Sequence, residues 1–243
     1  MSDILHNLRL IEERISQACI ENGRNPKDVR LLLATKTVSA EHIKIAIHAG
    51  HTLIAENKVQ ELKEKFEALR GISHTSHFIG HLQTNKIKDL INCNVSCIQS
   101  VDRFDLAQKL HRRLQLENKT MDVLIQVNTS LEESKFGVNP AHAITLIEQV
   151  SQLERLKIKG LMTIGLFSAK AEKVRACFRL LKDIREQVIA LHIPNVEMNE
   201  LSMGMSGDLE VAIAEGATII RVGTAIFGQR PKPDSYYWNE KQK

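Results

Sequence analysis

The chain has 243 residues, and its 33 Lys and Arg against 29 Asp and Glu give a formal net charge of +4. This length can bury a large core in a single domain, and the near balance of charge excludes the basic footprint of a nucleic-acid-binding protein. No apolar run is long enough to span a membrane. Residues 1–25 mix charges with apolar positions at helical spacing, which predicts an amphipathic helix and not a signal peptide. Four scattered cysteines are typical of reduced thiols in a cytoplasmic protein.

Short β-branched apolar runs alternate along the chain with helix-like stretches. Such alternation predicts parallel strands covered by helices, and eight units close a (β/α)8 TIM barrel, with an open doubly wound sheet as the alternative. The expected strands are Arg30–Ala34, Thr52–Ala55, Ser76–Ile79, Val95–Gln99, Val123–Val127, Ile158–Thr163, Glu197–Leu201 and Ala217–Val222.

One domain with an added N-terminal helix is expected over residues 1–230, followed by a tail over residues 231–243. Pro231 begins this tail, which holds both tyrosines and the only tryptophan of the chain. The barrel itself therefore has no tyrosine hydroxyl for chemistry.

Functional groups of a (β/α)8 barrel collect just past the C-terminal ends of its strands. Lys36 stands at this position after the first apolar run, Leu31–Ala34. We expect its amine at the barrel mouth, where partial loss of water favours the neutral nucleophile and suits Schiff-base chemistry. The alternative is an ordinary lysine that extends from a strand end to water.

Two glycine-containing turns after strands seven and eight predict a phosphate site. Residues 202–207 combine small residues, hydroxyls and backbone amides directly before a helix-like stretch, and Gly223-Thr224 follows the eighth strand. Two ordinary turns are the alternative.

Arg221 lies two residues before Gly223 and is expected to point into the barrel mouth, because alternate strand residues share a face. It could face a ring nitrogen, which a permanently charged arginine would leave unprotonated. An ion pair with a carboxylate is the alternative.

Three nearby histidines, His74, His77 and His81, suggest a metal site. On an extended strand, however, residues three apart face opposite sides, and neither paired carboxylates nor cysteines join them. We therefore expect no metal.

Six ordered motifs resemble the YggS/PROSC family of pyridoxal-phosphate-binding, vitamin B6 homeostasis proteins over nearly the full chain. The motif around strands seven and eight is the most specific, because it holds both phosphate turns and the arginine. The six are Ala34-Thr-Lys-Thr37, Glu56-Asn-Lys-Val-Gln-Glu61, His77-Phe-Ile-Gly-His-Leu-Gln-Thr-Asn-Lys86, Ser134-Lys-Phe-Gly137, Gly160-Leu-Met-Thr163, and Leu201-Ser-Met-Gly-Met-Ser206 through Arg221-Val-Gly-Thr-Ala-Ile-Phe-Gly228.

The resemblance implies a cofactor and a set of residues that bind it. Pyridoxal 5'-phosphate would form an internal aldimine with Lys36, and Arg221 would face its pyridine nitrogen. The residues implied around the phosphate are Ser202, Ser206, Gly223 and Thr224.

Three more residues match family motifs and are expected near the ring: Asn57, His81 and Met203. The chain departs from the family pattern at two positions. Ala55 stands where a glycine is usual, and Lys58 stands where a tyrosine is usual. The first departure should slightly alter the turn after strand two.

The family is similar in fold to the barrel of bacterial alanine racemase, which adds a β domain and uses a tyrosine as its second base. Without either, the chain resembles a carrier that holds pyridoxal phosphate, limits free aldehyde and helps to supply apo-enzymes that need it, as a cytoplasmic monomer and not as an enzyme. The alternatives are an amino-acid racemase or lyase with Lys36 as the only base, and a class I aldolase-type barrel without cofactor.

Overall fold

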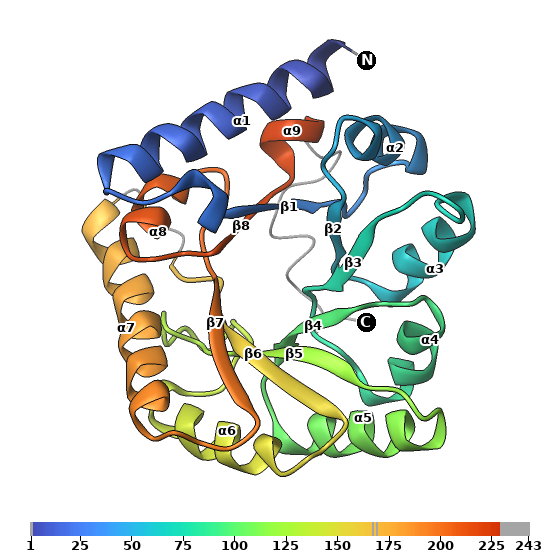
Figure 1. The fold of residues 1–243 in the computed structure, drawn as a ribbon, viewed down its shortest axis with the longest axis vertical. Coiled ribbons are helices and arrows are strands. Elements are labelled where there is room, and N and C mark those ends of the chain that lie inside the picture. The colour runs from blue at the N-terminus through green and yellow to red at the C-terminus, as the bar shows by residue number, and fades with distance from the viewer. Residues whose placement is uncertain (1, 167, 169, 229–243) are drawn as a thin grey trace.

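A computed structural model of the chain describes residues 2–166, 168 and 170–228. Eight parallel strands form a closed barrel in the order β1 to β8, so the predicted barrel is confirmed and the open sheet is excluded (Figure 1). The strands are β1 Arg30–Ala34, β2 Leu53–Glu56, β3 Thr75–Phe78, β4 Cys97–Val101, β5 Met121–Gln126, β6 Leu156–Met162, β7 Val196–Ser202 and β8 Ile219–Val222.

Helices surround the barrel and connect successive strands (Figure 1). The α-helices are α1 Ser2–Glu21, α2 Ala40–His48, α3 Val59–Ala68, α4 Ile87–Asn92, α5 Phe104–Leu116, α6 Ala143–Ser151, α7 Ala171–Ala190, α8 Leu209–Ala214 and α9 Thr224–Phe227. Short 3-10 turns occur at Pro26–Asp28, Thr84–Lys86 and Pro140–His142. The predicted tail, residues 231–243, lies outside the described residues.

The predicted strand positions hold to within about two residues, and β1 has the predicted limits. The largest differences arise because pairing with a neighbouring strand, and not apolarity alone, decides where a strand begins. Val95 is buried, for example, but pairing of β4 with β3 begins at Cys97, opposite His77. At the other end, β7 extends by one residue and includes Ser202.

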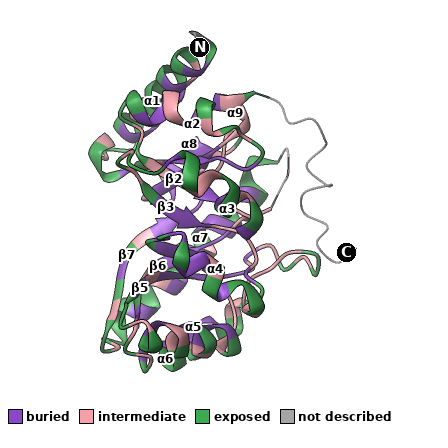
Figure 2. Ribbon diagram, turned by 90° about the vertical axis from the view of Figure 1, so that its right-hand side faces the viewer, coloured by how far each residue is buried: buried purple, intermediate pink, exposed green. Residues whose placement is uncertain are grey.

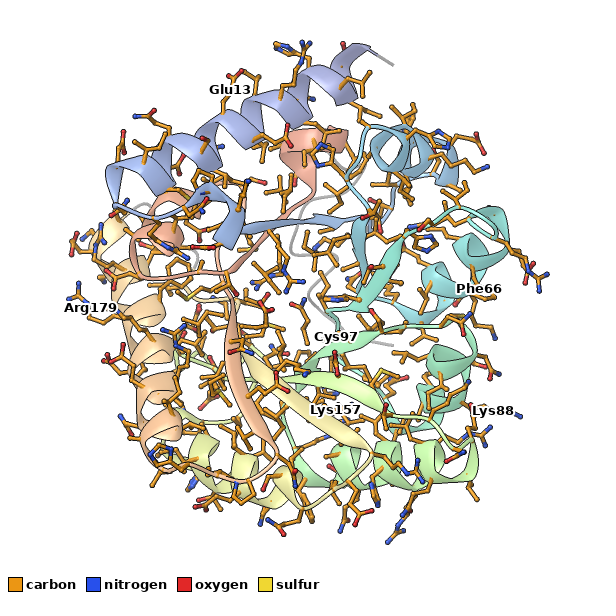
Figure 3. All side chains as sticks on the ribbon, viewed as in Figure 1. Glu13, Phe66, Lys88, Cys97, Lys157 and Arg179 are labelled. Carbon is orange, nitrogen blue, oxygen red and sulfur yellow. The ribbon has the colours of Figure 1, made fainter. Side chains whose placement is uncertain are left out.

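The apolar core has two parts, as expected when alternate strand residues face opposite sides. The larger part lies between strands and helices, and smaller clusters such as Leu32, Ala55 and Ile219 form separately from it. In Figure 2 the strands are mostly buried while the outer faces of the helices are exposed. Figure 3 shows Cys97 near the centre of the strand ring, whereas Glu13, Lys88 and Arg179 lie at the periphery.

The N-terminal helix α1 packs along α8 and α9, as Figure 1 shows. Its buried positions Ile4, Leu8, Ile11 and Ile15 are spaced four, three and four residues apart and so share one helix face. This confirms the amphipathic helix expected for residues 1–25. In the described part of the chain, none of the helices has both the length and the apolarity that a membrane span requires.

Candidate functional site

Lys36 lies two residues after the end of β1, at the barrel mouth where the sequence predicts it. The residue is only 8% exposed, and it lines a cavity of about 250 Å³. Gly223 and Thr224, which follow β8, line the same cavity. The structure therefore brings together the predicted lysine and one of the two predicted phosphate turns.

Glycine at position 223 allows the β8 turn to approach β1 closely. A Cβ atom on Gly223 would lie 2.8 Å from the carbonyl oxygen of Ala34, too close for any other residue without a local shift. Helix α9 begins at the next residue, Thr224. The first backbone N–H groups of a helix have no partner within the helix, so they can donate to an anion.

A buried chain of hydrogen bonds crosses the barrel interior from β8 to β3. Arg221 donates from Nη1 to Ser202 Oγ (2.9 Å), Ser202 donates to Gln99 Oε1 (2.6 Å), and Gln99 Nε2 bonds to His77 Nδ1 (2.8 Å). The second Arg221 nitrogen, Nη2, donates to the carbonyl oxygen of Thr163 (2.7 Å). Since Gln99 Nε2 can only donate, His77 Nδ1 must be the acceptor, and all the bonds of the chain run in one direction.

Arg221 is a buried cation without a carboxylate partner within ion-pair distance among the described residues. Burial lowers the pKa of Arg221 to about 10, and the nearby charge of Asp208 opposes this shift. The group stays charged near neutral pH. Among the described residues, neutral acceptors and not a carboxylate hold Arg221 in place.

Ser202, Met203 and Ser206 are not brought into the cavity that Lys36 lines. Ser202 was expected in the turn after β7, but it ends the strand and is fully buried against Arg221 and Gln99. Met203 packs fully buried in the apolar core. Ser206 is half-buried in the turn before α8, and its carbonyl oxygen accepts a bond from Arg14 (3.1 Å).

Asn57 and His81 lie at the ends of neighbouring strands, also outside that cavity. Gly80 passes so close to Asn57 that a Cβ there would meet the Asn57 carbonyl oxygen at 1.8 Å. The Asn57 Oδ1 atom is buried without a hydrogen-bond donor among the described residues. The His81 ring stacks on Phe136 (centroids 3.9 Å apart) and lies 3.7 Å from the Asp102 carboxylate. His81 thus connects the β3 end to the loop after β5.

The two departures from the family pattern have different surroundings. Ala55 is 1% exposed and packs with Leu32 and Ile219, so its methyl group fits this position. Lys58 precedes α3 as its N-cap residue, without a capping bond from its side chain. Nothing in the structure explains the lysine at this position.

The three histidines do not converge on one point. His74 Nδ1 lies 2.7 Å from the Ile72 carbonyl oxygen, whereas His77 bonds to Gln99. Within the described residues, no three or more His, Cys, Asp or Glu side chains are grouped so that they could hold a metal ion.

A group of charged residues that bonds to the backbone on both sides of Lys36 was not predicted from the sequence. Glu56 ends β2 and is 2% exposed, and Lys65 of α3 donates to its Oε1 atom at 2.7 Å. Burial raises the pKa of the Glu56 carboxyl, while the Lys65 charge acts against this rise. The one available signal in the sequence was the i, i+4 spacing of Glu61 and Lys65, which both lie on α3.

A closed parallel barrel, with a lysine after its first strand and a glycine turn beside it after the eighth, defines a barrel of the alanine racemase type. Residues 2–231 match the family model for the alanine racemase N-terminal domain. The alanine racemase of Clostridium difficile has the same fold, with a TM-score of 0.77 at 14% identity. The alignment covers 96% of this chain and 58% of the racemase.

Relatives with higher sequence identity define a smaller family within this class. The chain is 44% identical to the pyridoxal phosphate homeostasis protein of Aquifex aeolicus over 92% of its own length and 96% of the relative's. It is 38% identical to the Escherichia coli K12 protein of that name, over 95% and 98% of the two chains. PipY of Synechococcus elongatus, solved with PLP bound, is 33% identical with a TM-score of 0.78, over 88% and 100% of the two chains. The chain belongs to the pyridoxal phosphate homeostasis protein family, as its motifs predicted.

The buried imidazole of His77 makes stability depend on pH. Burial, with a smaller effect of Arg30, lowers the pKa of His77 from 6.5 to about 4. As the pH falls, the unfolded chain takes up this proton first, so the contribution of His77 to the free energy of unfolding declines between pH 6.5 and 4. The decline should total roughly 3 kcal/mol. Urea unfolding of wild type and His77→Gln at pH 7 and pH 4.5 measures it, and the variant should lose less stability.

His48→Gln is the matched control, because His48 is exposed. It should follow the wild-type pH dependence. Equal losses in wild type and His77→Gln would show that His77 does not cause the decline.

Proposed function

We propose that the protein binds pyridoxal 5'-phosphate through a covalent bond to Lys36 Nζ and serves in the homeostasis of this cofactor. The observation that carries the proposal is that Lys36 and the Gly223-Thr224 turn line one cavity at the barrel mouth. Membership of a family whose member PipY has been solved with PLP bound supports the choice of cofactor.

Two groups that line the cavity, the Lys36 amine and the turn at Gly223-Thr224, fit this cofactor chemically. Pyridoxal phosphate supplies an aldehyde that condenses with a lysine amine, with loss of one water. The backbone amides at the start of α9 suit its phosphate group. Arg221 does not line this cavity, but the family motifs imply that it faces the pyridine nitrogen. A permanently charged arginine there would leave the nitrogen unprotonated and the ring a weak electron sink.

If Lys36 is the lysine that binds the cofactor covalently, the absorbance band of the bound cofactor should require Lys36 and no other lysine. On titration with pyridoxal phosphate, the wild type should develop a visible band near stoichiometric ratio, and Lys36→Ala should not, because its side chain lacks the amine. Lys44→Ala is the control, since Lys44 lies on α2 and pairs with Glu41 at 2.9 Å. An equal band in wild type and Lys36→Ala would refute the assignment.

We also propose that the protein is a carrier, supplying apo-enzymes, and not an enzyme. Both tyrosines of the chain lie in residues 231–243, so residues 1–230 offer no phenol as a second base. A racemase or lyase built from residues 1–230 would therefore lack the tyrosine that alanine racemase uses as its second base.

Exchange of the α-proton separates these two functions. The loaded protein, incubated with L-alanine in D2O, should incorporate no deuterium above the level that free pyridoxal phosphate gives, as proton NMR can measure. Lys36-dependent incorporation at a rate of turnover would instead support the racemase or lyase.

A further inference from the structure

The peptide that carries Lys36 is held on both sides by charged side chains of α3. Before Lys36, the carbonyl oxygen of Thr35 accepts a hydrogen bond from Lys65 Nζ at 2.8 Å. After it, the backbone N–H of Thr37 donates to Glu61 Oε2 at 2.6 Å. The two contacts fix the backbone one residue to each side of Lys36.

The side chains that make these contacts are themselves fixed. Glu61 and Lys65 share a face of α3 at i, i+4 spacing and pair at 3.2 Å. Lys65 also donates to the buried Glu56 at 2.7 Å, and the Thr35 hydroxyl donates to the same Glu56 oxygen at 2.5 Å. The side chains of Lys65 and Glu61 are 13% and 20% exposed. Bonds between charged groups this sheltered from water are stronger than those at the surface.

The turn that these residues hold is one that its sequence disfavours. Thr37 has φ of 62°, in the left-handed region that β-branched residues rarely adopt. Such a conformation persists when surrounding contacts determine it. The contacts here are the Glu61 bond to Thr37 and the bond from the Val38 N–H to the Thr35 carbonyl oxygen (3.0 Å).

The contacts of Lys65 also separate its role from that of Lys36. An ammonium group has three donors, and Lys65 makes three bonds, to Thr35, Glu56 and Glu61. All its protons are thus used within the protein, so Lys65 acts as a structural cation and leaves Lys36 as the lysine that lines the cavity.

We infer that Lys65 and Glu61 are positioning residues that set the backbone of Lys36 for its reaction with the cofactor aldehyde. This inference rests on the proposed function, because it concerns how Lys36 reaches the cofactor. Neither residue lines the cavity, so both act through the backbone of residues 35 to 37.

Lys65→Met tests the inference against Lys63→Met, a lysine of the same helix that is 53% exposed and pairs with Asp89 at 3.3 Å. For Lys65→Met we expect the dissociation constant for pyridoxal phosphate, from the absorbance titration, to rise about tenfold. The pH midpoint of the absorbance band should also move upward, because Glu56 and Glu61 lose the one cation with which both pair. Lys63→Met should match the wild type in both measurements.

Glu61→Ala is a second test variant, which retains Lys65, and Glu67→Ala is its control. Glu67 is 66% exposed and pairs with Arg70 at 3.2 Å. Glu61→Ala should slow formation of the band and weaken binding, because the Thr37 N–H loses its acceptor. Glu61→Gln keeps an acceptor oxygen of the same reach and should recover most of the rate. Thermal unfolding of each variant tests whether it is folded. If Lys65→Met does not fold, the Glu61 variants alone test the positioning role.

The results test the proposed function and the positioning role separately. If the wild type gives no band that depends on Lys36, the proposed function fails. If the wild type gives the band, but the Lys65 and Glu61 variants bind with the affinity, rate and pH midpoint of their controls, the positioning role is overturned and the cofactor assignment stands.

Discussion

Pairing of β1 with β8 is the constraint on which the site depends. These strands are the first and last of the barrel, and four register pairs, from Arg30 with Ile219 to Leu33 with Val222, join them. Only this closure brings Lys36, near the start of the chain, beside Gly223, near its end. Gly223 permits the approach, since a side chain would press against the Ala34 carbonyl. The packing of α1 against α8 and α9 covers the outside of the same region.

Two sets of polar residues lie near this mouth, Arg221 with its acceptors and the group of Glu56, Glu61 and Lys65. Inside the barrel, Arg221 is held by the neutral acceptors Ser202 and Thr163. At the end of β2 and on α3, Glu56 and Glu61 share the single cation Lys65, and Lys65 and Glu61 act on the backbone around Lys36. Burying such groups is costly unless each is fully bonded.

The sequence allowed the barrel, the lysine and the β8 turn to be predicted, because each depends on local pattern: apolar runs of strand length, and polar residues that follow them. Ser202 was expected in a turn but ends β7, because the end of this strand depends on pairing with Met162 and Ile219. The bond of Gln99 to Ser202 and the bonds of Lys65 to the β1 turn join residues distant in sequence. The spacing of apolar residues along the sequence does not indicate such contacts, so these parts of the site are seen only in the structure.

The most direct test of the account is to identify the lysine that carries the cofactor. The protein, loaded with equimolar pyridoxal phosphate, would be reduced with borohydride, digested and mapped by mass spectrometry. We expect one pyridoxyl adduct, on Lys36, and no adduct on Lys65, whose three donors are bonded within the protein. An adduct on Lys65, or adducts spread over surface lysines with Lys36 unmodified, would contradict it.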